Sequence, residues 1–322
     1  MTGFERKRIE NALKYIERKK TVFRKKYSLH KWGLMTTIFS PEFYDKAAKK
    51  LGSEMFAPIV EFFNGAEDNT QETLIVILHR LYKFYKIEKI PEYLIDIILD
   101  SSFSTNVRKS AARMLTTCFA KISLNTIKEI YSIKEFQFDA LTCLPFCDDT
   151  GRHEFAIDVL NKLPSPQMTE YAVRALTADK ITLDDMGLLK LLYAQCKNPH
   201  LRYSIMELLY KSPQTGLENF FLTAYKKERL LPSRLQAIIG LCIKSNIEQA
   251  DTIMYEFIDA IKKRSFTDAR TLGDLRSVAE QVEELIKTYP SKGFLYANDV
   301  LSNLDVLQDK KSTGIAGVFR LK

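Results

Sequence analysis

The fold class of this chain is decided by a ten-residue segment, Asn106-Val107-Arg108-Lys109-Ser110-Ala111-Ala112-Arg113-Met114-Leu115. Val107, Ala111 and Leu115 stand four residues apart, which places them on one face of an α-helix. Comparable segments follow one another along the chain, separated by short breaks that carry Asn, Asp, Ser, Pro or Gly. Only 12 Gly and 10 Pro occur in 322 residues, which disfavours a turn-rich all-β fold. The chain is therefore predicted to be all-α.

The same segment reveals an internal repeat when equivalent leucines are aligned. These are Leu81, Leu115, Leu144, Leu176, Leu208 and Leu241, at successive spacings of 34, 29, 32, 32 and 33 residues. The small residues four positions before the last five leucines are Ala111, Ala140, Ala172, Ser204 and Ala237. A small residue one turn before a large one lets neighbouring helices approach, while the leucine fills the space between layers. The repeat is therefore a packing requirement that recurs about every 32 residues.

Helical segments alternate in pairs around this period. First members are predicted at about 53–65, 91–102, 124–133, 153–163, 182–197, 216–228 and 246–263. Second members are predicted at about 70–86, 105–119, 135–147, 165–179, 198–212, 231–245 and 268–289. Short connections make sequential helices antiparallel neighbours. The predicted architecture is a right-handed α-solenoid of antiparallel helix pairs.

Two segments resemble the second helix of HEAT repeats, in which a turn with Asp or Asn is followed by Val-Arg and then by Ala and Leu. They are Asn106–Leu115 and Asn198-Pro199-His200-Leu201-Arg202-Tyr203-Ser204-Ile205-Met206-Glu207-Leu208. Ser233-Arg234-Leu235-Gln236-Ala237 is a looser match, and the pairs that end at Leu144 and Leu176 lack the arginine. The resemblance covers about residues 53–290. It implies a scaffold without an active site, in which Arg108, Arg202 and Arg234 tie adjacent repeats together.

Other α-solenoids, tetratricopeptide-like repeats among them, and an irregular helical bundle are the alternative architectures. Residues 1–52 are predicted to be a basic helical cap, residues 53–290 the repeats, and residues 291–322 a capping helix near 293–307 with a short tail. The tail either folds back on the last repeat or serves as a peptide ligand for another protein.

The positive charge is concentrated at the amino terminus. Residues 1–31 hold three acidic and eleven basic residues, the latter being Arg6, Lys7, Arg8, Lys14, Arg18, Lys19, Lys20, Arg24, Lys25, Lys26 and Lys31. Subtracting these from the 48 basic and 40 acidic residues of the chain leaves 37 of each, so the body is neutral overall. A basic groove on the repeats is therefore not indicated.

A basic amphipathic helix is predicted over 4–27, with an apolar stripe formed by Ile9, Leu13, Ile16, Phe23 and Tyr27. The stripe either docks on the first repeat as a cap, or the helix binds an anionic membrane surface with Phe23, Tyr27 and Trp32 at the interface. Binding to nucleic-acid phosphates is the third reading.

Reactive constellations are not found in the sequence. It has neither the glycine-rich loops of phosphate sites nor a second Cys or His pair beside Cys143 and Cys147 that would complete a zinc site. The other cysteines are Cys118, Cys196 and Cys242, and we interpret all five as reduced, buried residues. We interpret His30, His79, His153 and His200 as surface or helix-start residues, and the doublets Asp148-Asp149 and Asp184-Asp185 as helix caps.

The sequence contains neither a signal peptide nor a membrane span, so a cytoplasmic location is expected, with association to the inner membrane surface as an option. The predicted function is a non-catalytic scaffold that holds a protein partner on its concave face, without metal or cofactor. The alternative is a peripheral factor that the amino-terminal helix recruits to a membrane or to nucleic acid. A minor alternative is a HEAT-like DNA glycosylase, which would need a basic groove with aromatic and acidic residues.

Overall fold

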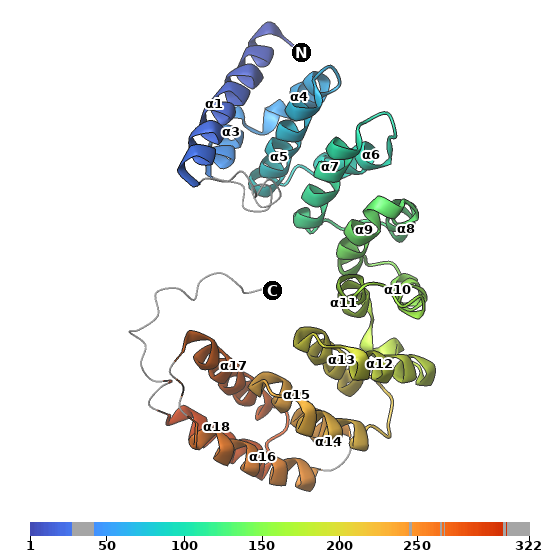
Figure 1. The fold of residues 1–322 in the computed structure, drawn as a ribbon, viewed down its shortest axis with the longest axis vertical. Coiled ribbons are helices and arrows are strands. Elements are labelled where there is room, and N and C mark those ends of the chain that lie inside the picture. Colours follow the sequence, from blue (N-terminus) through green and yellow to red (C-terminus); the bar gives the residue numbers. More distant parts are fainter. Residues whose placement is uncertain (28–41, 245–246, 265, 267, 305–306, 308–322) are drawn as a thin grey trace. The chain divides into compact units, whose positions relative to one another are not determined.

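The computed structural model describes residues 1–27, 42–244, 247–264, 266, 268–304 and 307, with only the backbone described for 23–27. All regular secondary structure in this part of the chain is helical (Figure 1), which confirms the all-α prediction. The chain divides into two compact units, Met1–Arg152 and His153–Lys322. The three-part division into cap, repeats and cap stays a prediction.

The first unit contains eight α-helices in its described residues: α1 (Gly3–Tyr27), α3 (Glu42–Leu51), α4 (Phe56–Phe63), α5 (Asp68–Tyr85), α6 (Lys89–Leu99), α7 (Thr105–Cys118), α8 (Leu124–Ser132) and α9 (Gln137–Cys143). Helix α5 packs against α3 and α7, and α7 packs against α6 and α9. The helices that the sequence places second in each pair therefore touch one another in succession. Phe63, Leu74, Ile98 and Phe136 are among the buried residues that fill the spaces between them.

The second unit contains α10 (Arg152–Asn161), which begins at the boundary, α11 (Pro166–Ala175), α12 (Leu183–Gln195), α13 (Pro199–Lys211), α14 (Glu218–Lys227), α15 (Leu231–Lys244), α16 (Ile247–Lys262), α17 (Ala269–Leu285) and α18 (Lys292–Ser302). Helix α13 packs against α11, α12 and α15. Helix α15 also packs against α14, α16 and α17. Phe221, Phe257 and Phe294 are fully buried in this unit.

Polar caps explain where many of these helices begin. The side chains of Ser104, Ser123, Ser165 and Asn198 accept hydrogen bonds from backbone amides in the first turns of α7, α8, α11 and α13. Each such bond satisfies one of the amides that a helix start leaves without an internal partner. At α12 the cap is reciprocal, because Thr182 and Asp185 each bond the backbone of the other.

The helix predicted over 135–147 is shorter than expected. α9 ends at Cys143, and Leu144–Phe146 is a 3-10 turn. Pro145 accounts for this end, since a proline has no backbone N–H and cannot donate a helical hydrogen bond. The helix predicted over 165–179 also ends early, at Ala175. Leu144 and Leu176 therefore lie just beyond their helices, although both are buried.

The register of α13 differs by one residue from the leucine alignment. Leu208 is only half-buried, whereas its neighbour Leu209 is fully buried. Ser204 is likewise half-buried, and Ile205 is the buried neighbour. At the other aligned positions Leu81, Leu115 and Leu241 are buried, as are Ala111, Ala140, Ala172 and Ala237.

Candidate functional site

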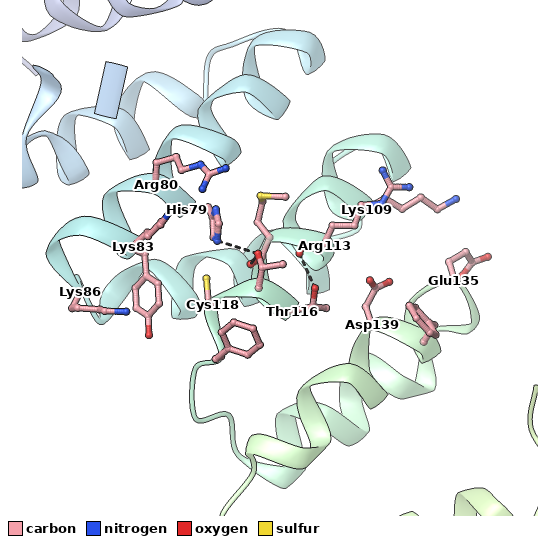
Figure 2. Close-up of a pocket in the computed structure, with 15 residues that line it drawn as sticks. His79, Arg80, Lys83, Lys86, Lys109, Arg113, Thr116, Cys118, Glu135 and Asp139 are labelled. Carbon is pink, nitrogen blue, oxygen red and sulfur yellow. Dashed lines mark hydrogen bonds between the residues drawn. The ribbon is translucent and has the colours of Figure 1, made fainter. Parts of the chain in front are cut away.

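A cavity of about 790 Å³ lies along α5, α7 and α9 in the first unit (Figure 2). We call it the basic cavity and define it by its lining residues: His79, Arg80, Tyr82, Lys83, Lys86, Lys109, Arg113, Met114, Thr116, Thr117, Cys118, Phe119, Glu135, Phe138 and Asp139. Its volume lies in the range of small-molecule and peptide-side-chain pockets. Five cationic side chains face two carboxylates across it.

Four of the five cations form no ion pair with the described residues. Arg80 is buried and pairs with Asp45 at 3.3 Å, so its charge is already compensated. The other four cations are Lys83, Lys86, Lys109 and Arg113. Within the part of the chain that the structure describes, their charged groups form no ion pair and donate no hydrogen bond. The cavity is thus supplied with positive charge that its own carboxylates only partly balance.

The helix dipole accounts for only some of these cations. Lys83 and Lys86 lie at the carboxyl end of α5, where positive charge is favourable. Lys109 and Arg113 lie in the first turns and the middle of α7, where the dipole offers no such stabilisation. Their placement beside the cavity therefore calls for a reason other than helix stability.

Exposed aromatic rings border the same cavity. The Phe119 side chain is 58% exposed and that of Phe138 is 40% exposed. Phe119 caps α7 in the left-handed region at φ 50°, and Lys86 caps α5 in the same way at φ 52°. Glycine is the usual residue at this cap, and another residue there costs about 1–2 kcal/mol. The ring of Phe119 is held edge-on against Phe146 with centroids 5.1 Å apart.

Burial shifts the pKa values of three titratable groups in the cavity. Burial lowers the pKa of His79 to about 4, and its Nε2 atom lies 3.0 Å from the Thr117 hydroxyl, so the ring is neutral at pH 7. Burial raises the pKa of Cys118 to about 12, which leaves an unreactive thiol. Burial also raises the pKa of Asp139 to about 6, although Arg113 and Lys109 oppose this shift. Asp139 is therefore the cavity group that titrates closest to neutrality.

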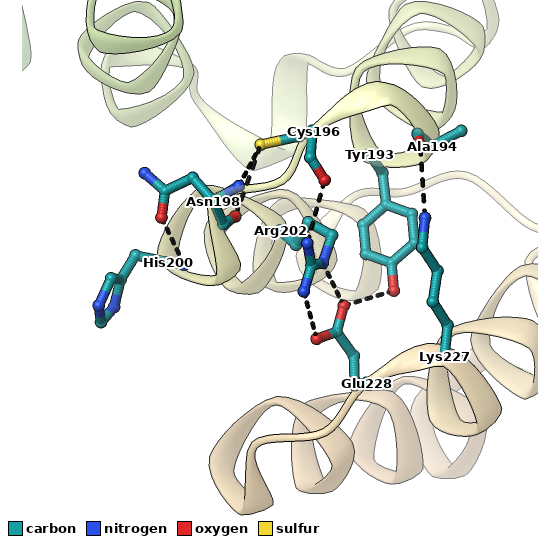
Figure 3. Close-up of polar contacts among 8 residues, drawn as sticks. All are labelled: Tyr193, Ala194, Cys196, Asn198, His200, Arg202, Lys227 and Glu228. Carbon is teal, nitrogen blue, oxygen red and sulfur yellow. Dashed lines mark hydrogen bonds and ion pairs between the residues drawn. The ribbon is translucent and has the colours of Figure 1, made fainter.

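A buried ion pair joins three helices in the second unit (Figure 3). The Arg202 guanidinium donates to Glu228 Oε1 at 2.6 Å and to Oε2 at 3.0 Å, and the Tyr193 hydroxyl donates to Oε1 at 2.7 Å. Arg202 Nη1 also donates to the Cys196 carbonyl at 3.0 Å. The Glu228 side chain is fully buried, so the ion pair and the hydrogen bonds are needed to offset the cost of removing its charge from water. The cluster fastens the start of α13 to the ends of α12 and α14.

The three predicted arginines occupy equivalent bridging positions. Arg108 donates to the Ile98 carbonyl at 2.8 Å and stacks over Phe136. Arg234 lies over the ring of Tyr225 on α14 and over that of Phe257 on α16. Like Arg202, each contacts the helix before its own and the segment after it. This geometry is that of a structural tie, and none of the three lines the basic cavity.

The apolar stripe of α1 is docked. Ile9 and Ile16 are fully buried, and α1 packs against α3 and α4. Arg8 donates to the Leu51 carbonyl at 2.5 Å and pairs with Glu54, and Lys20 donates to the Thr73 hydroxyl at 2.8 Å. Of the predicted anionic-surface residues, those exposed are Arg6, Lys7, Lys14, Arg18 and Lys19. Lys31 and Trp32 lie outside the described residues, as do the side chains of Phe23, Arg24, Lys25, Lys26 and Tyr27.

The opposite face of α1 is exposed. Lys7, Lys14 and Arg18 recur at intervals of seven and four residues on it, and their charges have no partner among the described residues. Phe4 is 72% exposed and Val22 is 61% exposed on the same side of the helix. By contrast, Arg6 pairs with Glu10.

Two of the histidines interpreted as surface or helix-start residues are buried. His79 lies within α5, and His153 accepts from the Thr177 amide at 3.2 Å and faces Asp185 at 3.5 Å. His153 is a helix-start residue, in the first turn of α10, as the sequence predicts. The interpretation was wrong for His79, which is buried within α5 because its ring has a polar partner in Thr117. His200 lies at a helix start, and His30 falls outside the described residues.

The acidic doublets act largely at helix ends. Asp185 belongs to the capping box of α12, and Asp149 accepts from the Leu124 amide at the start of α8. Asp148 instead forms an exposed ion pair with Lys121. Cys118, Cys143 and Cys147 are buried, while Cys196 and Cys242 are only partly covered.

The sequence prediction missed the basic cavity because it summed charge over the whole body. In the structure, basic residues of the first unit gather on α5 and α7 around the cavity, and a sum over the chain does not show this. A second hollow, of about 500 Å³, lies on α4 and α6 and is lined by Glu61, Glu92 and Asp96 with Lys89. The signal available in the sequence was the spacing of Lys86 and Phe119, which stand 33 residues apart, about one repeat, at equivalent helix ends.

No family model, curated protein or solved structure matches this chain. None of the described helices combines the length and the apolar character needed to cross a bilayer. In the same part of the chain, no three His, Cys, Asp or Glu side chains are grouped so that they could hold a metal ion.

Proposed function

We propose that this chain is a non-catalytic, protein-binding scaffold of the HEAT-like α-solenoid type, and that its partner binds on the face built by α5, α7 and α9. The basic cavity carries this proposal, since it combines exposed aromatic rings with cations that form no ion pair among the described residues, on three successive second-position helices. Exposed aromatic and cationic groups are the side chains that dominate protein interfaces. A cytoplasmic location belongs to the same proposal.

The repeat architecture is supported by two features. Helices in equivalent positions touch in succession, α5 with α7 and α7 with α9 in one unit, α11 with α13 and α13 with α15 in the other. Arg108, Arg202 and Arg234 make equivalent bridging contacts, as the HEAT resemblance implies. In a repeat array each repeat packs only against its neighbouring repeats, which leaves one side of the array available for a partner.

Site-specific photo-crosslinking tests the proposal. A photoreactive residue is placed at Lys109 or Phe138 in the cavity, or at the exposed control positions Glu92 on α6 and Glu129 on α8. We expect one protein to be crosslinked from the cavity positions and not from the controls. Equal labelling from both sets would refute the assignment of the binding face.

The same cavity contains the residue types that a glycosylase would need, with Asp139 among its aromatic and basic neighbours. Incubation with alkylated DNA therefore accompanies the crosslinking. If the parent chain releases a modified base and Asp139→Asn does not, the protein is an enzyme and the scaffold proposal is wrong.

A second candidate function is recruitment to an anionic membrane. The exposed face of α1 favours it, because Lys7, Lys14 and Arg18 would each gain about 1 kcal/mol near anionic headgroups. Phe4 and Val22 are exposed on that face and would enter the interface. A bilayer suits these apolar groups better than a nucleic acid does.

Vesicle co-sedimentation tests this candidate. The triple variant Lys7→Glu, Lys14→Glu, Arg18→Glu is compared with a control of equal charge change, Lys46→Glu, Lys50→Glu, Lys89→Glu, whose side chains are also exposed. We expect the first variant alone to stop sedimenting with phosphatidylserine vesicles. Substitution is used rather than deletion of α1, since deletion would uncover the core around Ile9 and Ile16.

A further inference from the structure

We infer that the basic cavity binds an acidic peptide segment of a partner protein, and that this segment carries at least one aromatic or large aliphatic side chain. The inference rests on the proposed scaffold function and specifies its partner. Three observations support it: the distribution of charge, the position of the apolar rim, and the two carboxylates on one side of the cavity.

The charge favours an anionic ligand. Lys83 and Lys86 lie on the α5 side of the cavity and Lys109 and Arg113 on α7 (Figure 2). None of the four forms an ion pair among the described residues, although Lys83 and Lys86 lie over the rings of Phe84 and Tyr82. Lys109 and Arg113 are half-buried, so a carboxylate bound there would be partly shielded from water. Charge-assisted hydrogen bonds in such a setting are stronger than those at a fully exposed surface.

The aromatic rim favours a ligand with an apolar side chain. Phe119 is 58% exposed, yet the left-handed backbone and the contact with Phe146 fix its direction. A ring held in this way loses little conformational entropy when it is covered. Phe138 on α9 and the half-buried Tyr82 on α5 supply further aromatic surface. Covering these rings supplies the apolar part of the binding energy.

Glu135 and Asp139 favour a peptide over a nucleic acid. Both line the cavity on the α9 side, close to Lys109 and Arg113. A single-stranded nucleic acid carries a phosphate at every nucleotide and would bring some of them against these carboxylates. A peptide can place its acidic residues at the lysines and a neutral residue or a backbone N–H group at the carboxylates.

Selection from a peptide library tests the inference. A phage library of random peptides of about twelve residues is selected on the full chain and then counter-selected on the double variant Lys83→Glu, Lys109→Glu. We expect the retained sequences to be rich in Asp and Glu and to share an aromatic or large aliphatic residue. Retained sequences without acidic enrichment would overturn the inference.

Titration of the best peptide then locates the site. We expect the double variant to bind it at least about tenfold more weakly, and Phe119→Ser about threefold to tenfold more weakly. The control variant Lys46→Glu, Lys89→Glu has the same charge change outside the cavity and should bind within about twofold. An equal loss in the control would show that net charge, and not the cavity, attracts the peptide.

Three further measurements separate the possible outcomes. Thermal unfolding verifies that each variant is folded. An oligothymidine of about twelve nucleotides serves as competitor, and if it binds more tightly than the peptide and loses affinity in the double variant, the ligand is a nucleic acid. If the crosslinked partner is still captured by the double variant, the scaffold function stands and only the acidic-peptide inference fails.

Discussion

Asp139 is the residue of the basic cavity whose pKa lies closest to neutral pH. Its folded-state pKa is raised to about 6 by burial, while an unfolded aspartate ionises near 3.8. Below the unfolded value both states are protonated, and the buried group costs nothing. As the pH rises from about 3.8 to about 6, the unfolded carboxyl ionises while the folded one stays protonated, and stability is lost; above about 6 the loss is complete.

The variant Asp139→Asn should therefore be more stable than the parent chain at about pH 7.5, by about 1–3 kcal/mol. The gain should shrink toward zero at about pH 3.5, because the carboxyl is then largely protonated in both the folded and the unfolded state. Urea unfolding at the two pH values measures the difference. Glu129→Gln, an exposed change on the neighbouring helix α8, is the control and should show no pH-dependent gain in stability. A constant gain at both pH values would contradict the assigned cause.

The Arg202–Glu228 pair illustrates a buried charge that only its partners make tolerable. Glu228→Ala leaves the guanidinium without its carboxylate and should destabilise the second unit by about 3–5 kcal/mol. The double variant Arg202→Met, Glu228→Met removes both charges and should be less destabilised than Glu228→Ala alone. Equilibrium unfolding in urea compares them. If the double variant proved the weaker, the pair would be a net source of stability.

At the scale of the element, close helix contacts depend on particular glycines. Gly240 on α15 faces the ring of Phe221 on α14, and an added Cβ would lie well inside van der Waals contact with that ring. Phe221 is fully buried and has no space to move into. The closeness of α14 and α15 therefore requires the absence of a side chain at position 240.

Gly240→Ala should accordingly destabilise the protein by about 1–3 kcal/mol through overpacking. Gly273→Ala, on the exposed side of α17 with nothing within 4 Å of the new methyl group, should instead stabilise by about 0.5–1 kcal/mol. The two changes are chemically identical, so the opposite signs isolate packing from helix propensity. Thermal melts of both variants provide the measurement, and equal signs would disprove the packing explanation.

At the scale of the whole molecule, the chain consists of two compact units, each with its own buried phenylalanines. Asp139 belongs to the first unit and Gly240 to the second. Effects at independent sites add to within about 0.5 kcal/mol. The gain from Asp139→Asn at pH 7.5 should thus be the same in the parent chain and in a Gly240→Ala background. A difference above that margin in urea unfolding would reveal coupling between the units.

The sequence alone determined the all-α class and most helix positions. Leucines about 32 residues apart and caps such as Ser104 and Asn198 act locally, and a local pattern can be read without knowing the neighbours. Even the docking stripe of α1 was correctly identified at Ile9 and Ile16. The choice between a docked stripe and a free one was left open.

Only the tertiary structure decided which side chains meet. Leu209 rather than Leu208 is buried, because the helices packed against α13 determine its rotation. Lys83, Lys109 and Asp139 come from three helices, and only the packing of α5, α7 and α9 brings them to one cavity. Summed charge over the body is zero, yet a ligand responds to the charges within a Debye length of about 8–10 Å. The arrangement of charge in space, which no sum over the sequence contains, therefore defines the candidate site.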